Sequence, residues 1–214
     1  KLSSKRRISA YGLKTADSQL IRQGENYTEA DINLDYPIFI KPVDGGGGSG
    51  INEHSLVRNF GELSRQIDWL MSQVNTDALL ETYLPGREFS VGVLKKRFSN
   101  GYNLLPLEIV APINQMGGRF LSSIVKRQDA EQTFEVIDVS LRQKVNSLAY
   151  KAFMALGAED YGRIDIRLDE SGEPHFLEAN LLPSLLDNYG NLPKAALLNI
   201  GLSHTELIHK IANL

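Results

Sequence analysis

Four polar residues on two predicted strands have the types and the spacing of a metal site. Arg163 and Asp165 alternate with apolar residues in the run 161–168, and Glu178 and Asn180 lie in the run 174–180. The intervening Asp-Glu-Ser-Gly-Glu has the composition of a tight turn. A turn centred on its Ser-Gly pair sets Asp165 opposite Glu178. The same register sets Arg163 opposite Asn180, and all four side chains share one face because side chains alternate along a strand.

A bound cation would stabilise this arrangement. Two carboxylates directly opposite each other on paired strands repel, at a cost of up to ~1 kcal/mol. A divalent cation reverses the sign of that interaction, and Asp, Glu and Asn oxygens are the ligands that Mg²⁺ prefers. The hairpin therefore predicts a metal site with an arginine beside it.

The alternative is a solvated strand face that is charged without a function. The opposite face argues against it, since its apolar side chains are expected to be buried: Ile164, Ile166, Leu177 and Ala179. A Leu-Leu-Pro sequence follows Asn180 and indicates crowded surroundings. The polar face is therefore interpreted as the floor of a cleft.

A glycine-rich segment follows the predicted strand 35–41. Residues 45–50 read Gly-Gly-Gly-Gly-Ser-Gly, with Gly46, Gly47 and Gly48 at the centre. Glycine allows backbone N–H groups to approach an anion and to adopt positive φ, so such a run is either a flexible linker or a phosphate cradle. A Walker A motif is excluded because Ile51 stands where it needs lysine. Lys41 at the end of the strand favours the phosphate cradle.

A third segment has residues suited to a nucleoside. The run 78–88 ends a strand, passes through Pro-Gly and resumes as a strand. Glu81, Tyr83 and Leu84 could form an apolar slot with a carboxylate for a purine, and Glu88 could accept a ribose hydroxyl. Taken alone, this segment is only a hairpin with two acidic residues.

Composition limits the class of protein. The 214 residues contain no cysteine and have a formal net charge of −3, which excludes disulfides and argues against a dedicated nucleic-acid binder. No apolar run is long enough to span a bilayer, so we expect a cytoplasmic protein without a membrane partner. The first residue is Lys1, inside a predicted helix, and the sequence is expected to begin within a longer protein.

The predicted elements favour an α+β fold with largely antiparallel sheets, because strands and helices do not alternate regularly. Helices are expected at 3–11, 55–72 and 140–156, followed by the hairpin and two short helices, the second opened by a Ser203/Glu206 capping box. Further strands are expected at 78–84, 88–94 and 104–110, and residues 14–34 are expected to be irregular.

In this order, the segments resemble the ATP-grasp superfamily, and most closely the D-alanine–D-alanine ligase family. The matching stretches are Lys-Leu-Ser-Ser-Lys at 1–5, Ile-Lys-Pro at 40–42 with Gly-Ile at 50–51, 80–89, Gly-Arg-Ile-Asp at 162–165 and Leu-Glu-Ala-Asn at 177–180 with Pro183. The resemblance implies two lobes with mainly antiparallel sheets that grip ATP. The expected lobes are residues 1–97, with a linker helix and the glycine loop, and residues 98–214, with the metal site.

The resemblance also implies roles for single residues. Lys1, Lys41 and Lys126 are expected to bind the phosphates of ATP, together with the glycine loop. Adenine contacts are expected from Glu81, Tyr83 and Leu84, and a ribose contact from Glu88. Mg²⁺ or Mn²⁺ ligands are expected to be Asp165, Glu178 and Asn180, and Arg163 is expected to face the reacting carboxyl group.

The implied reaction joins a carboxylate to an amine through an acyl phosphate, with an amino acid or peptide as substrate. The sequence departs from the ligase pattern at Gly47 and Gly48, where the ligases have serines, and in the Pro-Ser-Leu-Leu segment at 183–186, where the acceptor pocket is expected to differ. Another amino-acid ligase, a carboxylase-type enzyme and a nucleotide-binding module without ligation remain alternatives. A homodimer is left open, and the N-terminal domain of the family is expected to lie outside this sequence.

Overall fold

The computed structural model describes residues 1–97, 99 and 101–214, and these divide into two compact units. The first unit consists of Lys1–Leu2, Ala16–Leu84 and Val110–Gln132, and the second of Ser3–Thr15, Pro85–Ile109 and Thr133–Leu214. The compact units partition the chain differently from the predicted lobes 1–97 and 98–214, since residue 97 lies between two paired strands of the second unit. Each unit contains its own sheet, and the predicted α+β class is confirmed.

The first unit is built on a four-stranded sheet of order β1-β4-β2-β3, whose pairs are antiparallel. Its strands are β1 (Ser18–Ile21), β2 (Ile38–Pro42), β3 (Leu56–Val57) and β4 (Ala78–Thr82). The helix α2 (Phe60–Trp69) and the π-helical turn η3 (Leu70–Val74) bury Leu63, Ile67 and Leu70 in the core of this unit. Its shorter elements are η1 (Glu29–Asp31), η2 (Glu53–Ser55) and α3 (Ser123–Arg127).

Two predictions for the first unit were wrong. The segment 14–34 contains β1, which the sequence does not signal because only Ile21 of its four residues is buried. The helix expected from residue 55 begins at Phe60. Asn59 caps it, since its side chain accepts a hydrogen bond from the backbone N–H of Glu62, and the preceding residues form η2 and β3.

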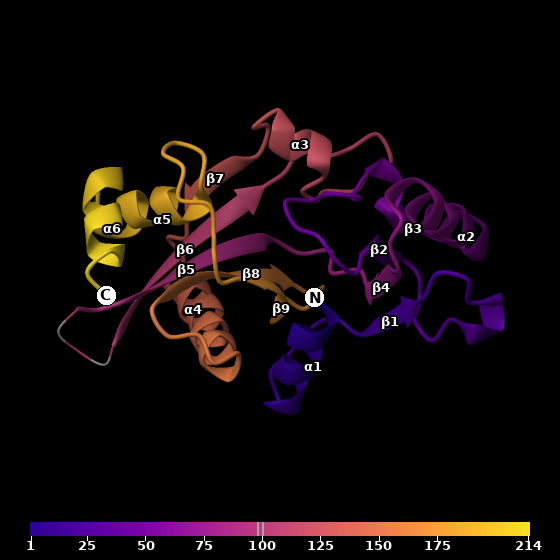
Figure 1. Ribbon diagram of the computed structural model, residues 1–214, viewed down its shortest axis with the longest axis horizontal. Coiled ribbons are helices and arrows are strands. Elements are labelled where there is room, and N and C mark those ends of the chain that lie inside the picture. Colours follow the sequence, from indigo (N-terminus) through magenta and orange to yellow (C-terminus); the bar gives the residue numbers. More distant parts are fainter. Residues whose placement is uncertain (98, 100) are drawn as a thin grey trace. The chain divides into compact units, whose positions relative to one another are not determined.

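The second unit contains a five-stranded sheet of order β7-β6-β5-β8-β9 (Figure 1). Its strands are β5 (Glu88–Lys95), β6 (Tyr102–Val110), β7 (Gln132–Glu135), β8 (Tyr161–Leu168) and β9 (Pro174–Asn180), and its helices are α1 (Leu2–Ala10), α4 (Val139–Ala155), α5 (Asn191–Ile200) and α6 (His204–Ile211). The predicted capping box of α6 is confirmed.

Helices α4 and α5 cover opposite faces of this sheet. Phe153 of α4 packs against Gly162 of β8, and Leu192 of α5 packs against Gly92 of β5. In the antiparallel register Gly92 pairs with Arg163, the neighbour of Gly162, so these two glycines point to different faces. The α4 face contains the apolar core, whereas α5 leaves part of the other face to polar residues.

A bulge in β9 decides which side chains reach the core. Asp165 pairs with Glu178, but Ile166 pairs with Phe176, so Leu177 lies between the two registers. The expectation that Leu177 belongs to the buried face was wrong: Phe176 is fully buried and takes that place, and Leu177 is only partly buried. Without the bulge, strict alternation would put Phe176 and Glu178 on the same face.

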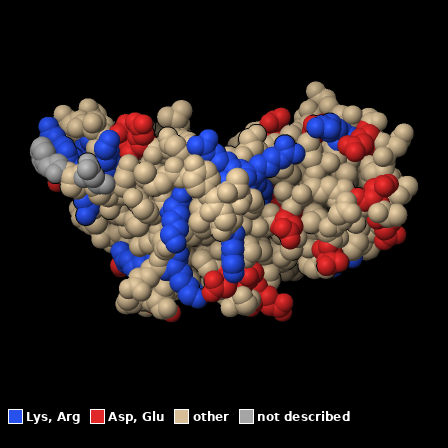
Figure 2. Space-filling view, turned by 90° about the horizontal axis from the view of Figure 1, so that it is seen from below, with Lys and Arg blue, Asp and Glu red and all other residues tan. Residues whose placement is uncertain are grey.

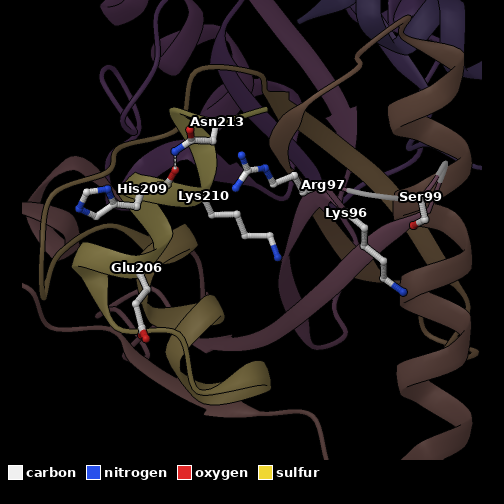
Figure 3. A pocket seen from close by; sticks show the side chains of 7 residues that line it. All are labelled: Lys96, Arg97, Ser99, Glu206, His209, Lys210 and Asn213. Atoms are coloured by element: carbon white, nitrogen blue, oxygen red, sulfur yellow. Dashed lines mark hydrogen bonds between the residues drawn. The ribbon is translucent and has the colours of Figure 1, made fainter.

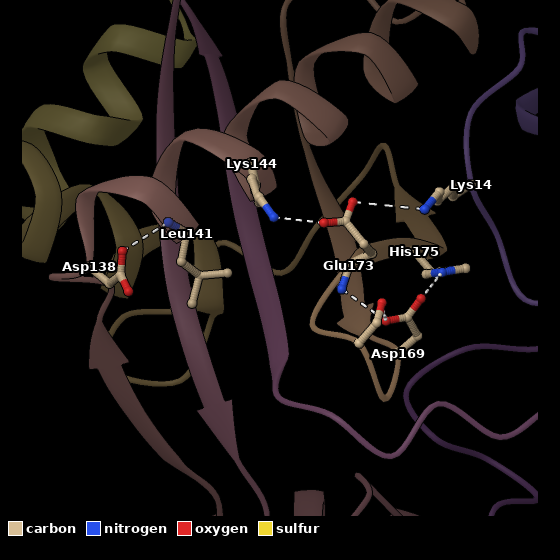
Figure 4. Close-up of polar contacts among 8 residues, drawn as sticks. Lys14, Asp138, Leu141, Lys144, Asp169, Glu173 and His175 are labelled. Atoms are coloured by element: carbon tan, nitrogen blue, oxygen red, sulfur yellow. Dashed lines mark hydrogen bonds and ion pairs between the residues drawn. The ribbon is translucent and has the colours of Figure 1, made fainter.

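Charged side chains fix the turn between β8 and β9 (Figure 4). Asp169 accepts hydrogen bonds from Ser171 Oγ at 2.7 Å and from the backbone N–H of Glu173 at 2.9 Å, and His175 Nε2 lies 3.0 Å from its Oδ2. These contacts hold the pKa of Asp169 well below its usual value, and the hydrogen bond from the Ser171 hydroxyl has the largest effect. Glu173 also pairs with Lys144 of α4 at 2.7 Å, so the turn is tied to the helix that covers the core.

The surface carries charges of both signs. Figure 2 shows Lys and Arg side chains in separate groups on the face in view, with Asp and Glu side chains near several of them. Exposed ion pairs of this kind include Lys95 with Asp160 at 3.2 Å. Within the described residues, no helix has the length and the apolar character needed to cross a membrane.

The glycine run 45–50 adopts backbone conformations that other residues avoid. Gly45, Gly47, Gly48 and Gly50 have φ between +65° and +80°. A Cβ atom on Gly50 would overlap with Cγ of Pro42, whereas one on Gly45 would meet no atom within 4 Å. Gly50 is therefore required both for its φ and for its close contact with the end of β2.

We predict that Gly50→Ala destabilises the protein more than Gly45→Ala. The left-handed conformation costs either alanine roughly 1–2 kcal/mol, and the contact with Pro42 adds about 1–3 kcal/mol at position 50 alone. Urea unfolding of both variants measures the difference. Equal free energies of unfolding would contradict the packing at Gly50.

Candidate active site

The face of the second sheet that α5 covers only in part carries a lattice of polar residues. Its three rows across β5, β8 and β9 are Glu88–Arg167–His175, Ser90–Asp165–Glu178 and Gly92–Arg163–Asn180. The predicted pairing of Asp165 with Glu178 and of Arg163 with Asn180 is confirmed. The hairpin thus brings together every residue that the sequence analysis assigned to the metal site.

Asp165 lies at the centre of this lattice and accepts four hydrogen bonds. Ser90 Oγ donates to Oδ1 at 2.8 Å, and Asn180 Nδ2 donates to Oδ2 at 3.0 Å. Arg163 donates Nε to Oδ1 and Nη2 to Oδ2, each at 3.0 Å. Bidentate pairing of this kind fixes the plane of the carboxylate as well as its charge.

Arg163 supplies the positive charge of this cluster. Burial opposes its charge, but Asp165 outweighs that effect, with help from Glu178 and Glu88, so the pKa of the Arg163 guanidinium is raised above its ordinary value. Its side chain is only 14% exposed. Arg163 therefore stands among three carboxylates on a face that it shares with Arg167, which pairs with Glu88.

The donor set at the second and third rows fits a hard divalent cation. Asp165 and Glu178 are directly opposite, and Asn180 turns its Nδ2 toward Asp165, so its carbonyl oxygen is the atom left for a cation. The described part of the chain holds no cluster of three or more His, Cys, Asp or Glu side chains arranged for a metal ion. The set at Asp165 has two carboxylates and one amide, which is fewer oxygen ligands than a divalent cation takes. We therefore expect it to bind a cation weakly until further oxygen ligands, such as phosphates, join it.

The first row fixes the predicted ribose contact. Arg167 Nη1 donates to Glu88 Oε2 at 3.1 Å, and both side chains are largely buried, at 7% and 16% exposure. Glu88 is therefore held in one orientation at the start of β5.

In the first unit, Lys41 and Glu81 form a buried ion pair. Lys41 Nζ lies 2.8 Å from Glu81 Oε2, and the side chains are 7% and 3% exposed. Antiparallel pairing of β2 with β4 places Lys41 opposite Leu79. Glu81 is two residues further along β4, so its side chain is on the same face of the sheet as that of Lys41. The predicted phosphate lysine and the predicted adenine contact are thus neighbours, and Tyr83 and Leu84 follow directly after β4.

Lys1 holds the base of the glycine loop. Its Nζ donates to the carbonyl oxygens of Pro42, Asp44 and Gly45 at 3.0, 2.9 and 2.8 Å. An ammonium group in this position fixes the start of the loop. These three hydrogen bonds place the Lys1 side chain beside the glycine loop. A direct contact between Lys1 and a phosphate stays a prediction.

The segment with Lys126 also packs on the loop. A Cβ on Gly48 would lie 3.3 Å from the carbonyl oxygen of Leu121, and the backbone N–H of Ser123 donates to the carbonyl of Ile51 at 3.3 Å. Lys126 lies on α3, whose first turn is capped by Ser122. The fold therefore brings the glycine loop and the predicted phosphate lysine at 126 into one region of the first unit.

Sequence reasoning missed Ser90 and Arg167. Both are buried and both hold a predicted site residue, Asp165 and Glu88 respectively. Period-two alternation from Glu88 along β5 would have placed Ser90 on the polar face, but only the register with β8 sets it opposite Asp165.

A surface pocket of ≈ 690 Å³ lies at the other end of β5, near the end of α6 (Figure 3). It is lined by Lys96, Arg97, Ser99, Glu206, His209, Lys210 and Asn213. The carboxylate of Glu206 accepts hydrogen bonds from its own capping partner Ser203. The seven steps from Glu88 to Lys95 span roughly 23 Å, so this pocket is remote from the polar lattice.

We predict that Ser90→Ala weakens the second unit by about 1.5–3 kcal/mol, the range for a buried hydrogen bond to a charged group. Ser90→Thr keeps the hydroxyl and serves as the matched variant. Urea unfolding of Ser90→Ala, Asp165→Ala and the double variant isolates the coupling between the two side chains, because alanine removes the acceptor at position 165. A coupling energy near zero would show that the Ser90 hydroxyl does not hold Asp165.

The chain is similar to D-amino-acid ligases over nearly its whole length. A D-alanine–D-alanine ligase of Clostridium beijerinckii is 31% identical over an alignment of 215 positions, which covers 97% of this chain and 65% of the relative. A solved D-alanine–D-alanine ligase of Bacillus anthracis in complex with ATP superposes with a TM-score of 0.78 at 20% identity, covering 99% of this chain and 64% of that protein. The VanG D-Ala:D-Ser ligase of Enterococcus faecalis gives 0.77 at 23% identity, covering 100% and 60%.

These similarities confirm the predicted ATP-grasp fold, and the chain spans less than two thirds of the length of these relatives. The family described as "D-ala D-ala ligase C-terminus" matches residues 8–213, which include all the predicted site residues except Lys1. The chain therefore belongs to the family of the D-alanine–D-alanine ligase C-terminus.

Proposed function

We propose that this chain carries the ATP-binding and catalytic residues of an ATP-dependent carboxylate–amine ligase, of the D-alanine–D-alanine ligase type. The observation that carries the proposal is the polar lattice, in which Arg163 and Asn180 both donate hydrogen bonds to Asp165, beside Glu178. Largely buried charges cost desolvation energy that their pairing offsets only in part, so a cluster of this kind is expected at a working site rather than in a chain that keeps the fold alone.

The first unit is proposed to bind the nucleotide. Lys41 and Lys126 would contact the phosphates beside the glycine loop, and Lys1 would hold that loop in shape. Glu81, Tyr83 and Leu84 would bind adenine. In the second unit, Glu88, oriented by Arg167, would accept a hydrogen bond from the ribose.

The proposed reaction makes a poor acyl donor reactive. An oxygen of the substrate carboxylate attacks the γ-phosphorus of ATP, the bond to the β-phosphate oxygen breaks, and ADP leaves. The amine of the second substrate then attacks the carbonyl carbon of the acyl phosphate; the carbon–oxygen bond breaks, phosphate leaves and the nitrogen loses a proton. No nucleophilic side chain is needed, because alignment and charge neutralisation dominate such transfers.

The residues of the lattice would supply that neutralisation. Asp165, Glu178 and Asn180 would hold Mg²⁺ or Mn²⁺, which lowers the charge repulsion around a transferred phosphoryl group when it is bound. Arg163 would orient the reacting carboxylate and stabilise charge on its oxygens. An amino acid or a peptide is the proposed substrate class.

Glu178→Gln is predicted to lower amino-acid-dependent release of phosphate from ATP by about 100-fold or more, because it removes a charged cation ligand and keeps the side-chain shape. Glu173→Gln is the matched control, since Glu173 lies in the turn and pairs with Lys144. The assay uses the complete protein with a panel of amino-acid pairs, and circular dichroism checks that both variants are folded.

Normal turnover in Glu178→Gln would contradict the metal assignment. ATP binding by the unmodified protein without phosphate release for any amino acid or dipeptide offered would favour a nucleotide-binding module over a ligase.

A further inference from the structure

All four acceptor positions of Asp165 are occupied by protein donors. A carboxylate has about four lone-pair sites. Oδ1 receives Ser90 Oγ and Arg163 Nε, and Oδ2 receives Arg163 Nη2 and Asn180 Nδ2. A cation that takes an oxygen of Asp165 as ligand therefore has to replace at least one of these donors.

The three donor residues differ in how freely they can leave. Ser90 is 2% exposed, has a short side chain and is directly opposite Asp165 in the strand register. Asn180 is fixed by the hairpin, and its own carbonyl oxygen is a proposed ligand. Arg163 has a long side chain that reaches two residues along its own strand, so it can release Asp165 by side-chain rotation alone, without a change in the backbone.

Charge selects the same donor. Arg163 is the only cation among the donors of Asp165, and it interacts with the same carboxylates, Asp165 and Glu178, that a divalent cation would bind. Two cations that share these oxygens repel, whereas Ser90 and Asn180 are neutral and do not.

We propose that Arg163 is an internal counter-ion that neutralises Asp165 until a divalent cation binds, and that it then exchanges this carboxylate for the carboxylate of the substrate. The inference rests on the proposed function and adds a sequence of binding events to it, in which the cation binds before Arg163 contacts the substrate. Cation binding and the delivery of Arg163 to substrate become one event, and Ser90 and Asn180 keep Asp165 in place during the exchange.

The exchange predicts that loss of the Arg163 charge strengthens binding of the cation. In Arg163→Met, Mn²⁺ should bind the protein on the order of tenfold more tightly, because one competing positive charge close to the site has been removed. Electron spin resonance of free Mn²⁺ measures the dissociation constant without substrate and without turnover. Arg163→Lys keeps the charge and should bind Mn²⁺ nearly as the unmodified protein does.

Arg87→Met is the matched control for net charge. Arg87 is next to β5 but pairs with Glu108 at 2.6 Å, and its guanidinium lies 5.4 Å from the ring centre of Phe89. Mn²⁺ affinity in Arg87→Met should equal that of the unmodified protein. Unchanged or weaker Mn²⁺ binding in Arg163→Met relative to this control would overturn the exchange.

A second measurement uses the unmodified chain, so it does not depend on the stability of a variant. The ¹⁵N Nε signal of Arg163, assigned with Arg163→Lys, should shift when Mg²⁺ is added, while the signal of Arg87 stays in place. A static Arg163 signal at saturating Mg²⁺ would refute the exchange and leave the ligase proposal intact. Absence of protein-bound Mn²⁺ in every variant, with and without a non-hydrolysable ATP analogue, would overturn both the exchange and the metal site on which the proposed function depends.

Discussion

The candidate site depends on the neutralisation of one carboxylate, that of Asp165. Its hydrogen bonds come from β5, β8 and β9, so three strands of the second unit meet at this side chain. Glu178 lies directly opposite and would repel it, which makes a nearby positive charge a condition of this register. Arg163 meets that condition in the structure, and the rows on either side of Asp165 place the other polar residues relative to it.

The rest of the second unit makes such a cluster tolerable. The opposite face of the sheet contains the apolar core and packs on α4, so the strands are held by hydrophobic contacts that do not involve the polar lattice. The bulge at Leu177 turns Phe176 inward and Glu178 outward, and so serves both faces at once. The first unit has a smaller counterpart in the buried pair of Lys41 and Glu81, beside a glycine loop whose base is held by Lys1.

Sequence patterns were informative where a local rule decides the structure. Helical spacing with a terminal glycine located α4 to within a residue. Polar alternation identified the residues of the hairpin face, but the pairing of Asp165 with Glu178 also needs the bulge in β9, because the register next to the turn, Leu168 with Pro174, would by itself set Asp165 opposite Leu177. Sequence patterns did not predict the structure where partners that are distant in sequence determine it. The strand β1 exists because it pairs with β4, the inward position of Phe176 follows from a bulge, and the bond of Ser90 to Asp165 spans 75 residues. Local periodicity contains none of this information.

The most direct test of this account is calorimetric titration of a non-hydrolysable ATP analogue, with and without Mg²⁺, into the complete protein and into its Asp165→Asn variant. The account predicts that Mg²⁺ tightens binding of the analogue to the unmodified protein and that this gain disappears in Asp165→Asn, whose side chain has the same shape and no charge. Binding that is equally tight without Mg²⁺, or a gain from Mg²⁺ that survives in Asp165→Asn, would contradict the central role given to this carboxylate.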